Sequence, residues 1–195
     1  MSITDHQQIA SDRFPRELVR RLLDNYRGKT LDHAPTSMTE PATVFTDPTR
    51  FQKEVDLLFR QGSHIVGWTG ELARPGTFVT KNVAGHPVLI TRAEDGVLRA
   101  FRNACSHRGA QVAQGCGEAR RLTCPYHSWS YELNGDLAGQ PQAYAFSDID
   151  KSTLGLAPLP IADVAGLIAV SLSDDGDPAA AFDAFFHLDF HLRGK

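Results

Sequence analysis

Hydrophobic side chains near the start of the chain recur at the spacing of one face of a helix. The apolar side of this pattern consists of Phe14, Leu18, Leu22 and Leu23, and arginines occupy the opposite side. This spacing predicts a helix over Asp12–Arg27. The next segment, His33–Thr43, carries two prolines and several turn-forming residues, which predict an extended linker.

A second helix is predicted immediately after the linker. Asp47 followed by Pro48 is a favourable N-cap and first-turn pair, so the helix should run over Pro48–Arg60. Its expected buried face consists of Phe51, Val55, Leu58 and Phe59. Together, the linker and the two helices predict a helical arm at the start of the chain.

From about residue 60 the pattern changes to short apolar and β-branched runs separated by turn residues. The predicted strands are His64–Trp68, Thr77–Val83, Val88–Arg92, Val97–Asn103 and Gly166–Leu172. Glu94–Val97 contains Asp-Gly and Leu133–Asp136 contains Asn-Gly, two dipeptides typical of hairpin turns. The spacing of these runs indicates an antiparallel β module.

The predicted architecture is therefore mainly β, with helices at both ends. We expect an N-terminal helical arm and linker over 1–60, a β domain over 61–172 and a tail over 173–195. Within the tail, Pro178–His187 has a helical pattern.

Composition narrows the class of protein. The chain has 195 residues, of which 42% are hydrophobic and 22% charged, and its formal net charge is −3. This balance gives no electrostatic reason to expect nucleic acid or an anionic membrane as a partner. No apolar run is long enough to span a membrane, and the N-terminus lacks the apolar core of a secretory signal, so we expect a cytoplasmic protein.

All three cysteines and two of the eight histidines fall between positions 105 and 127. The candidate ligands are Cys105, His107, Cys124 and His127. Each pair lies within one short loop, so two loops on a β scaffold could hold one centre between them. Two Cys and two His match a 2Fe–2S centre with thiolates on one iron and imidazoles on the other. A structural zinc site is the alternative, although its paired ligands usually have wider spacing.

The surrounding residues closely resemble the Rieske family. "CSHRG" and "CPYHSW" match its two cluster-binding loops, and the best match is the large (α) subunit of aromatic ring-hydroxylating oxygenases. The matching residues are Asn103, Cys105, His107, Arg108, Gly109, Cys124, Pro125, Tyr126, His127, Trp129, Tyr131, Gly135 and Leu137. The resemblance covers about Phe45 to Leu172 and implies a Rieske-type antiparallel β sandwich.

The same resemblance implies the cofactor and its electron path. Cys105 and Cys124 would hold the buried iron of a Rieske-type 2Fe–2S cluster, and His107 and His127 would hold the outer iron. Electrons would pass from an NAD(P)H-dependent reductase or a ferredoxin through this cluster to a non-haem iron that activates oxygen. The expected pathway is aromatic hydrocarbon catabolism.

The chain departs from the family pattern at two loop positions. Ser128 stands where glycine is most common, and Val112 stands where leucine is usual. Respiratory-type Rieske proteins carry an extra cysteine in each loop, and Ala110 and Tyr126 occupy those places here. By this resemblance the reduction potential should fall toward the low end of the Rieske range, about −150 to +300 mV.

Several other residues have simpler explanations. Cys116, in a glycine-rich turn, is expected to be a free thiol. Gly109 permits either a turn or a close backbone approach. Arg108 either joins an ion pair behind the ligands or is solvated. Trp129 and Tyr131 either shield the cluster or only pack in strands.

The end of the chain does not match the mononuclear iron site of these oxygenases. That motif has two His five apart and an Asp three residues before the first. In this chain His187 and His191 are four positions apart, and Asp189 lies between them. Asp183 stands four positions before His187. We therefore expect an amphipathic tail there and no catalytic domain in this chain.

Three roles for the chain remain open at this stage. It could be a fragment of an oxygenase, one half of a split oxygenase that pairs with a catalytic subunit, or a stand-alone Rieske-type ferredoxin. A zinc-stabilised interaction module is the non-redox alternative. Oxidoreductase activity is implied only by resemblance.

Overall fold

The structure is a computed structural model that describes residues 3–34 and 36–185. These residues form two compact units. One holds the described residues up to Asp47 together with Phe185, and the other is Pro48–Ala184. The expected boundaries of the β domain, at 61 and 172, lie inside the second unit and stay a prediction.

The first unit contains the predicted N-terminal helix. Helix α1 spans Ile3–Gly28, so it begins before the predicted start at Asp12, and a short helix α2 spans Thr43–Thr46. The apolar residues of α1 whose side chains are described are exposed, among them Leu22 at 55% and Leu23 at 46%. Most of the segment between the two helices is irregular, as its prolines predict.

The second unit opens with the second predicted helix. It consists of α3, Pro48–Glu54, followed directly by the π-helical turn η1, Val55–Arg60. The predicted extent of this helix is therefore confirmed, but its predicted burial is wrong. Phe51, Leu58 and Phe59 are exposed at 65%, 63% and 47%, and Val55 is only half-buried.

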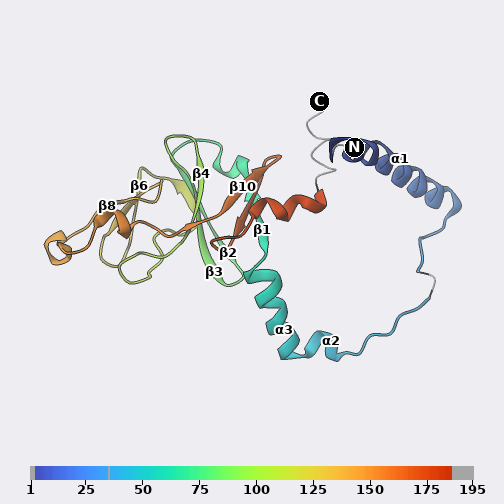
Figure 1. Cartoon of the computed structure of the whole chain (residues 1–195), viewed down its shortest axis with the longest axis horizontal. Coiled ribbons are helices and arrows are strands. Elements are labelled where there is room, and N and C mark those ends of the chain that lie inside the picture. The colour runs from blue at the N-terminus through green and yellow to red at the C-terminus, as the bar shows by residue number, and fades with distance from the viewer. Residues whose placement is uncertain (1–2, 35, 186–195) are drawn as a thin grey trace. The chain divides into compact units, whose positions relative to one another are not determined.

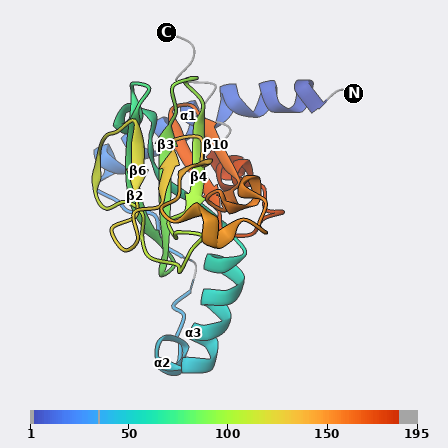
Figure 2. The same cartoon turned by 90° about the vertical axis from the view of Figure 1, so that its left-hand side faces the viewer.

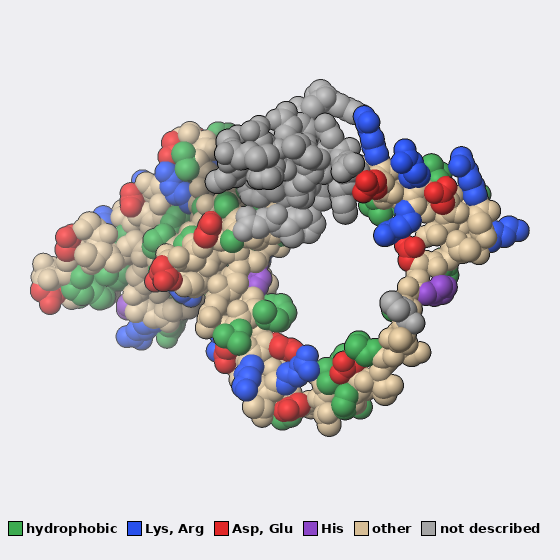
Figure 3. Space-filling model, turned by 45° about the vertical axis from the view of Figure 1, so that its right-hand side comes forward, with side chains coloured by type: hydrophobic (Ala, Val, Ile, Leu, Met, Phe, Trp, Pro, Cys, Tyr) green, Lys and Arg blue, Asp and Glu red, His purple; other side chains and the backbone are tan. Residues whose placement is uncertain are grey.

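The helix forms without burial because its polar side supplies local support. Arg50 pairs with Glu54 and Arg60 pairs with Asp56, both at the i,i+4 spacing that stabilises a helix by about 0.2–0.5 kcal/mol per pair. Figure 1 shows α3 extending away from the sheets. Hydrophobic side chains lie among charged ones along α2 and α3 in the space-filling view (Figure 3).

The remainder of this unit is built from short strands. The strands are β1 Ser63–Trp68, β2 Thr77–Val83, β3 His86–Arg92, β4 Leu98–Arg102, β5 Cys116–Glu118, β6 Arg121–Thr123, β7 Ser130–Glu132, β8 Leu137–Gly139, β9 Pro158–Leu159, β10 Ile161–Val164 and β11 Leu167–Ser171. The 3₁₀ helices are η2 Thr69–Leu72, η3 Ala143–Phe146, η4 Lys151–Leu154 and η5 Pro178–Phe185.

These strands form three antiparallel sheets, so the mainly β fold is confirmed (Figures 1 and 2). Their orders are β1-β11-β10, β5-β2-β3-β4-β9 and β6-β7-β8. The five strands predicted from the sequence correspond to β1, β2, β3, β4 and β11. No ranges were predicted for the short strands β5 to β10, of two to four residues each, although Tyr131 of β7 was expected to lie in a strand.

Strand β3 separates two hydrophobic cores. Val88 and Ile90 enter a core that also contains Ile168 and Val170 of β11. Leu89 points to the opposite side, into a core that contains both loop cysteines, Cys105 and Cys124. Because successive side chains of a strand alternate between faces, a strand buried on both sides reads as a continuous apolar run.

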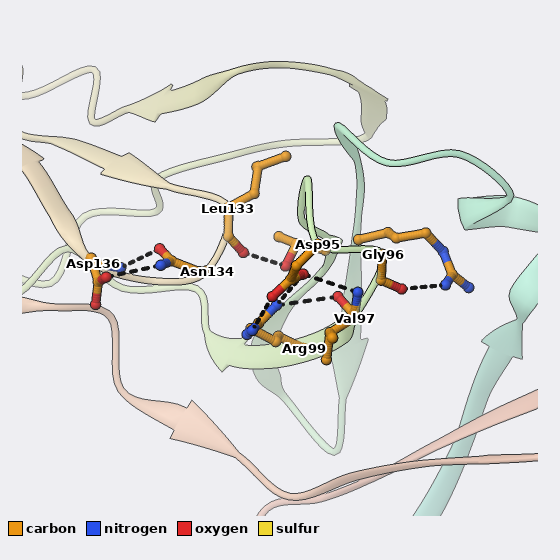
Figure 4. Close-up of polar contacts among 9 residues, drawn as sticks. Asp95, Gly96, Val97, Arg99, Leu133, Asn134 and Asp136 are labelled. Carbon is orange, nitrogen blue, oxygen red and sulfur yellow. Dashed lines mark hydrogen bonds and ion pairs between the residues drawn. The ribbon is translucent and has the colours of Figure 1, made fainter.

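The β7–β8 turn attaches the small sheet to the central one. The buried hydroxyl of Thr91 on β3 donates a hydrogen bond to the carbonyl oxygen of Leu133 at 2.7 Å (Figure 4). Gly135 in this turn has a φ of +96°, and an added Cβ would lie 2.4 Å from the Phe101 ring. Glycine is therefore required, and the turn places the strand that follows the second cysteine loop.

Among the described residues, no helix combines the length and apolar character needed to cross a membrane.

Candidate metal centre

The first cysteine loop connects β4 to β5 and is closed at its base by Asn103. This side chain is 1% exposed. Its Oδ1 accepts hydrogen bonds from the N–H groups of Val112 and Ala113 at 2.9 and 3.2 Å, and its Nδ2 donates to the Ala113 carbonyl at 2.8 Å. A buried amide with its hydrogen-bonding groups satisfied fixes the two ends of a loop against each other. Asn103 thus clamps the loop that carries Cys105 and His107.

Both cysteine loops share one backbone hydrogen-bond pattern. In the first, Cys105 N–H donates to the Ala110 carbonyl and Gly109 N–H donates back to the Cys105 carbonyl, both at 2.8 Å. In the second, Cys124 N–H donates to the Trp129 carbonyl at 2.8 Å and Ser128 N–H donates to the Cys124 carbonyl at 3.1 Å. Each cysteine therefore begins the same tight turn.

The fourth residue after each cysteine adopts the left-handed conformation. Gly109 has a φ of +73° and Ser128 a φ of +59°. An added Cβ at Gly109 would meet nothing within 4 Å, so the turn itself, and no close contact in the structure, explains this glycine. Ser128 is the equivalent position in the second loop, which gives a physical reason why glycine is the more usual residue there.

The two cysteine side chains lie inside the protein as free thiols. Cys105 is 4% exposed and Cys124 is 2% exposed, and both belong to one hydrophobic core. The Tyr131 hydroxyl lies 3.1 Å from the Cys105 sulfur and also accepts a hydrogen bond from Ser106 N–H at 3.1 Å. Because that N–H can only donate, the phenolic proton is free to point at the sulfur.

The two histidines meet on the outer side of the cysteines. The ring centroids of His107 and His127 are 4.7 Å apart. Trp129, which is buried, stacks on His107 at 5.0 Å with the planes 9° apart, and Tyr126 lies against His127 at 3.8 Å. The structure therefore brings the two predicted imidazoles together from separate loops.

The electrostatics of the site favour neutral imidazole and neutral phenol. Burial, then the nearby His127 and Arg108, lowers the pKa of His107, so its ring is neutral near neutral pH. Burial and the hydrogen bond with Cys105 raise the pKa of Tyr131, which keeps its hydroxyl protonated. Neutral imidazole is the form that ligates a metal, and a protonated phenol can donate to a thiolate.

These residues fit a binuclear cluster. His127 Nδ1 is buried and has no hydrogen-bond partner, which is costly for a polar atom unless a metal completes its surroundings. Across the described residues, no group of three or more His, Cys, Asp or Glu could hold a metal ion. A zinc ion needs about four ligands around one point, whereas each iron of a Rieske cluster takes only two from the protein.

The structure settles several side issues. Cys116 is an exposed free thiol, although it begins β5 and does not lie in a turn. Arg108 is exposed. Trp129 lies just before β7, outside any strand, and it contacts His107 directly. Tyr131 reaches a cysteine sulfur, a contact that its place in the sequence does not predict.

Two contributors to the site were missed from the sequence. The role of Asn103 was not recognised, although it lies in the matched motif. Phe146 contacts His107 from a distant segment and lies in no motif. The tail residues His187, Asp189 and His191 and the side chain of Asp183 lie outside the described part of the structure.

Comparison with known proteins identifies the domain. Residues 63–156 match the family model described as the Rieske [2Fe-2S] domain. The chain is 33% identical over 138 residues to the carnitine monooxygenase oxygenase subunit of Acinetobacter baumannii, covering 70% of this chain and 37% of that protein. It is 35% identical over 155 residues to the glycine betaine monooxygenase oxygenase subunit of Chromohalobacter salexigens. This match covers 78% of this chain and 34% of that protein.

Solved structures agree with this assignment. A quaternary ammonium Rieske monooxygenase in complex with L-carnitine matches with a TM-score of 0.72 and 28% identity over 84% of this chain and 48% of that one. Naphthalene 1,2-dioxygenase from a Rhodococcus species matches with a TM-score of 0.70 and 31% identity. This match covers 78% of this chain and 35% of that one. The chain thus spans about a third of the length of its curated relatives.

The expected aromatic hydrocarbon pathway does not match the curated relatives, which are named for quaternary ammonium substrates. The sequence could not separate the two branches, because solved structures of both a quaternary ammonium Rieske monooxygenase and a naphthalene dioxygenase match this chain, at 28% and 31% identity.

Proposed function

Residues 63–156 belong to the Rieske [2Fe-2S] domain family, and from this premise we propose that the domain relays electrons to a non-haem iron oxygenase centre. The donor would be an NAD(P)H-dependent reductase or a ferredoxin, and the acceptor an oxygenase catalytic domain or subunit. The observation that carries this proposal is the convergence of two buried thiols and two imidazoles from a pair of matched turns.

We propose that Cys105 and Cys124 ligate the inner iron and that His107 and His127 ligate the outer iron. When bound, a Rieske cluster accepts and releases one electron at a potential above that of all-cysteine clusters, because neutral imidazoles replace two anionic thiolates. The burial of the cysteines and the partial exposure of the histidines support this orientation. It places the imidazoles toward the side that a redox partner can approach.

The protein's own groups would tune the site. The Tyr131 hydroxyl would donate to the Cys105 thiolate and reduce its charge density, which favours the reduced state. Trp129 stacks on His107 and limits contact with water. The Asn103 clamp would hold Cys105 and His107 at a fixed separation.

We propose a quaternary ammonium compound as the substrate class of the oxygenase served by this domain. This proposal is supported by two relatives, 33% and 35% identical, whose names give carnitine and glycine betaine as substrates. An oxygenase assay with carnitine, glycine betaine and naphthalene as competing substrates would test this choice.

The cluster is tested by metal and sulfide analysis of the purified protein. We expect about two irons and two acid-labile sulfides per chain, a red-brown colour and a Rieske-type electron paramagnetic resonance (EPR) spectrum. Stoichiometric zinc without colour would instead support the zinc-stabilised module.

A single substitution tests the ligand assignment. His107→Cys exchanges a neutral ligand for an anionic one, so the reduction potential should fall toward the all-cysteine value of about −400 mV. His33→Cys, at an exposed histidine of the other unit, is the matched control and should leave the potential unchanged. An unchanged or higher potential for His107→Cys would contradict the assignment.

A further inference from the structure

The segment that follows β8 returns to the metal centre and is anchored there. It contains η3 and η4 and ends at Gly155. The Ser106 hydroxyl, next to Cys105, donates a hydrogen bond to the Gly155 carbonyl at 2.6 Å. The end of this segment is therefore attached to the first cysteine loop.

Local hydrogen bonds hold the segment in shape. Asp150 caps η4 by accepting a hydrogen bond from Ser152 N–H at 2.9 Å. Ile149 N–H donates to the Phe146 carbonyl at 3.1 Å, which closes the turn between the two 3₁₀ helices. On the other side of Phe146, Ala145 N–H donates to the Gln142 carbonyl at 2.9 Å, so the backbone is constrained on both sides of that residue.

Phe146 is the hydrophobic residue of this turn that faces the site. Tyr144 and Ile149 are exposed at 79% and 42%, whereas Phe146 is half-buried against the core that contains Cys105 and Cys124. Its ring meets His107 edge-on, with centroids 5.8 Å apart and planes 87° apart. It meets Trp129 in the same way at 5.3 Å and 85°.

These contacts surround one imidazole with aromatic groups. Trp129 covers a face of His107, while Phe146 and His127 both meet its ring in edge-type contacts. Edge-to-face contacts are directional, so each restricts rotation of the ring. His127 has Tyr126 against it, and Tyr126 is 59% exposed, so the two histidines have different surroundings.

We propose that Phe146 is a positioning residue for His107: its ring completes an aromatic enclosure that fixes the imidazole plane and reduces its contact with water. This inference rests on the proposed role of His107 as a cluster ligand. It adds a residue outside both cysteine loops to the determinants of the reduction potential.

The sign of the effect follows from charge. An oxidised cluster with two thiolates and two neutral imidazoles is roughly neutral, and the added electron makes it anionic. Water stabilises the charged state more than the neutral one. Removal of Phe146 admits water beside His107, so the reduction potential should rise, and a less restricted ring should broaden the EPR lines.

The experiment compares variants of the full chain purified with its cluster. Phe146→Ala removes the ring, and Phe146→Leu keeps an apolar cover without an aromatic edge. Leu154→Ala is the matched control, because Leu154 is a half-buried residue of the same segment that packs on the same core. The measurements are reduction potential, EPR line shape, the rate of cluster release to an iron chelator, and thermal unfolding.

We expect Phe146→Ala to raise the potential, broaden the EPR lines and accelerate cluster release several-fold, with Phe146→Leu intermediate. Leu154→Ala should lower thermal stability with the potential and line shape unchanged. Equal potentials and line shapes for Phe146→Ala and Leu154→Ala would overturn the proposal. If Phe146→Ala does not retain its cluster, Phe146→Leu decides by the same criteria. A wild-type protein without a Rieske EPR spectrum would instead refute the proposed function.

Discussion

At the residue scale, Tyr131 controls the environment of one cysteine sulfur. Its hydroxyl accepts from Ser106 N–H and reaches the Cys105 sulfur at 3.1 Å inside a hydrophobic core. A hydrogen bond to an ionised group in such surroundings is stronger than an ordinary one. The contact favours whichever redox state places more negative charge on the sulfur.

Tyr131→Phe should therefore lower the reduction potential. Loss of the donor destabilises the reduced state more than the oxidised state, and a differential of about 1 kcal/mol corresponds to a shift on the order of 50 mV for one electron. Protein-film voltammetry measures this directly. Tyr144→Phe removes the same hydroxyl from a residue that is 79% exposed and should have no effect. A potential that rises in Tyr131→Phe would contradict the direction of this hydrogen bond.

The second residue-scale prediction concerns Ser128, whose φ of +59° matches that of Gly109 in the other loop. A non-glycine residue in this backbone region costs about 1–2 kcal/mol, and replacement by glycine removes this cost. Glycine also makes the unfolded chain more flexible, which offsets about half of the gain. Ser128→Gly should thus stabilise the protein by about 0.5–1 kcal/mol in urea unfolding. Ser147→Gly, at a φ of −66°, is the control and should not stabilise. Equal effects of the two substitutions would argue against strain at Ser128.

Single residues also show where sequence reasoning stops. The four candidate ligands could be chosen because their spacing within each loop is itself the signal. Tyr131 contacts Cys105 although the two residues are 26 positions apart in the sequence. Phe146 contacts His107 across 39 positions. No local pattern encodes such distances, because the sheets that create them are assembled from separate parts of the chain.

At the element scale, the β3–β4 turn is held by charged groups. Asp95 pairs with Arg99 at 2.7 Å and accepts the Val97 N–H at 3.0 Å (Figure 4). The hydrogen bond from Arg99, then that from Val97, lowers the pKa of Asp95 to about 2. A folded-state pKa below the unfolded value means that the ionised carboxylate stabilises the folded turn.

The contribution of Asp95 should depend on pH with a definite sign. It is fully present above about pH 4, where the carboxylate is also ionised in the unfolded chain, and it is lost as the pH falls through about 2. The difference in urea midpoint between wild type and Asp95→Asn should therefore shrink on acidification. In an Arg99→Gln background the same substitution should have a smaller effect. A difference that is constant from neutral to acidic pH would contradict the role of ionised Asp95.

Elements differed in how well the sequence predicted them. Strands β1 to β4 and β11 have five to seven residues, enough for apolar and β-branched runs to stand out. Strands β5 to β10 have only two to four residues each, and β6 and β7 flank the second cysteine loop, so no comparable run stands out there. The β3–β4 and β7–β8 turns were predicted from Asp-Gly and Asn-Gly, because the left-handed backbone at Gly96 and Gly135 favours glycine locally, whereas the β2–β3 and β10–β11 turns, at Ala84-Gly85 and Ala165-Gly166, were not predicted.

At the scale of the whole molecule, an apolar stripe predicts a helix better than it predicts burial. The stripes of α1 and α3 were both recognised, but Leu22 and Phe51 are exposed at 55% and 65%. Helix formation depends on local spacing and on pairs such as Arg50–Glu54, whereas burial requires a surface to pack against. Sequence alone specifies the first of these and leaves the second undetermined.

The division into two compact units gives a prediction for the intact chain. Both cysteine loops, their clamp and the aromatic enclosure lie within Pro48–Ala184, and the segment before it contains the exposed residues Leu31 and Met38, at 75% and 81%. Brief digestion with thermolysin should cut near these two residues first, because exposed irregular backbone is cleaved most readily.

The fragment that begins after this cut should keep the visible absorption, EPR spectrum and reduction potential of the intact protein, because none of the contacts described at the metal centre involves a residue before Pro48. Mass spectrometry locates the cut, and spectroscopy of the purified fragment reports on the cluster. Bleaching in step with cleavage at Leu31 or Met38 would show that the first unit contributes to the centre. Bleaching only after cuts within Pro48–Ala184 would agree with a centre built entirely by the second unit.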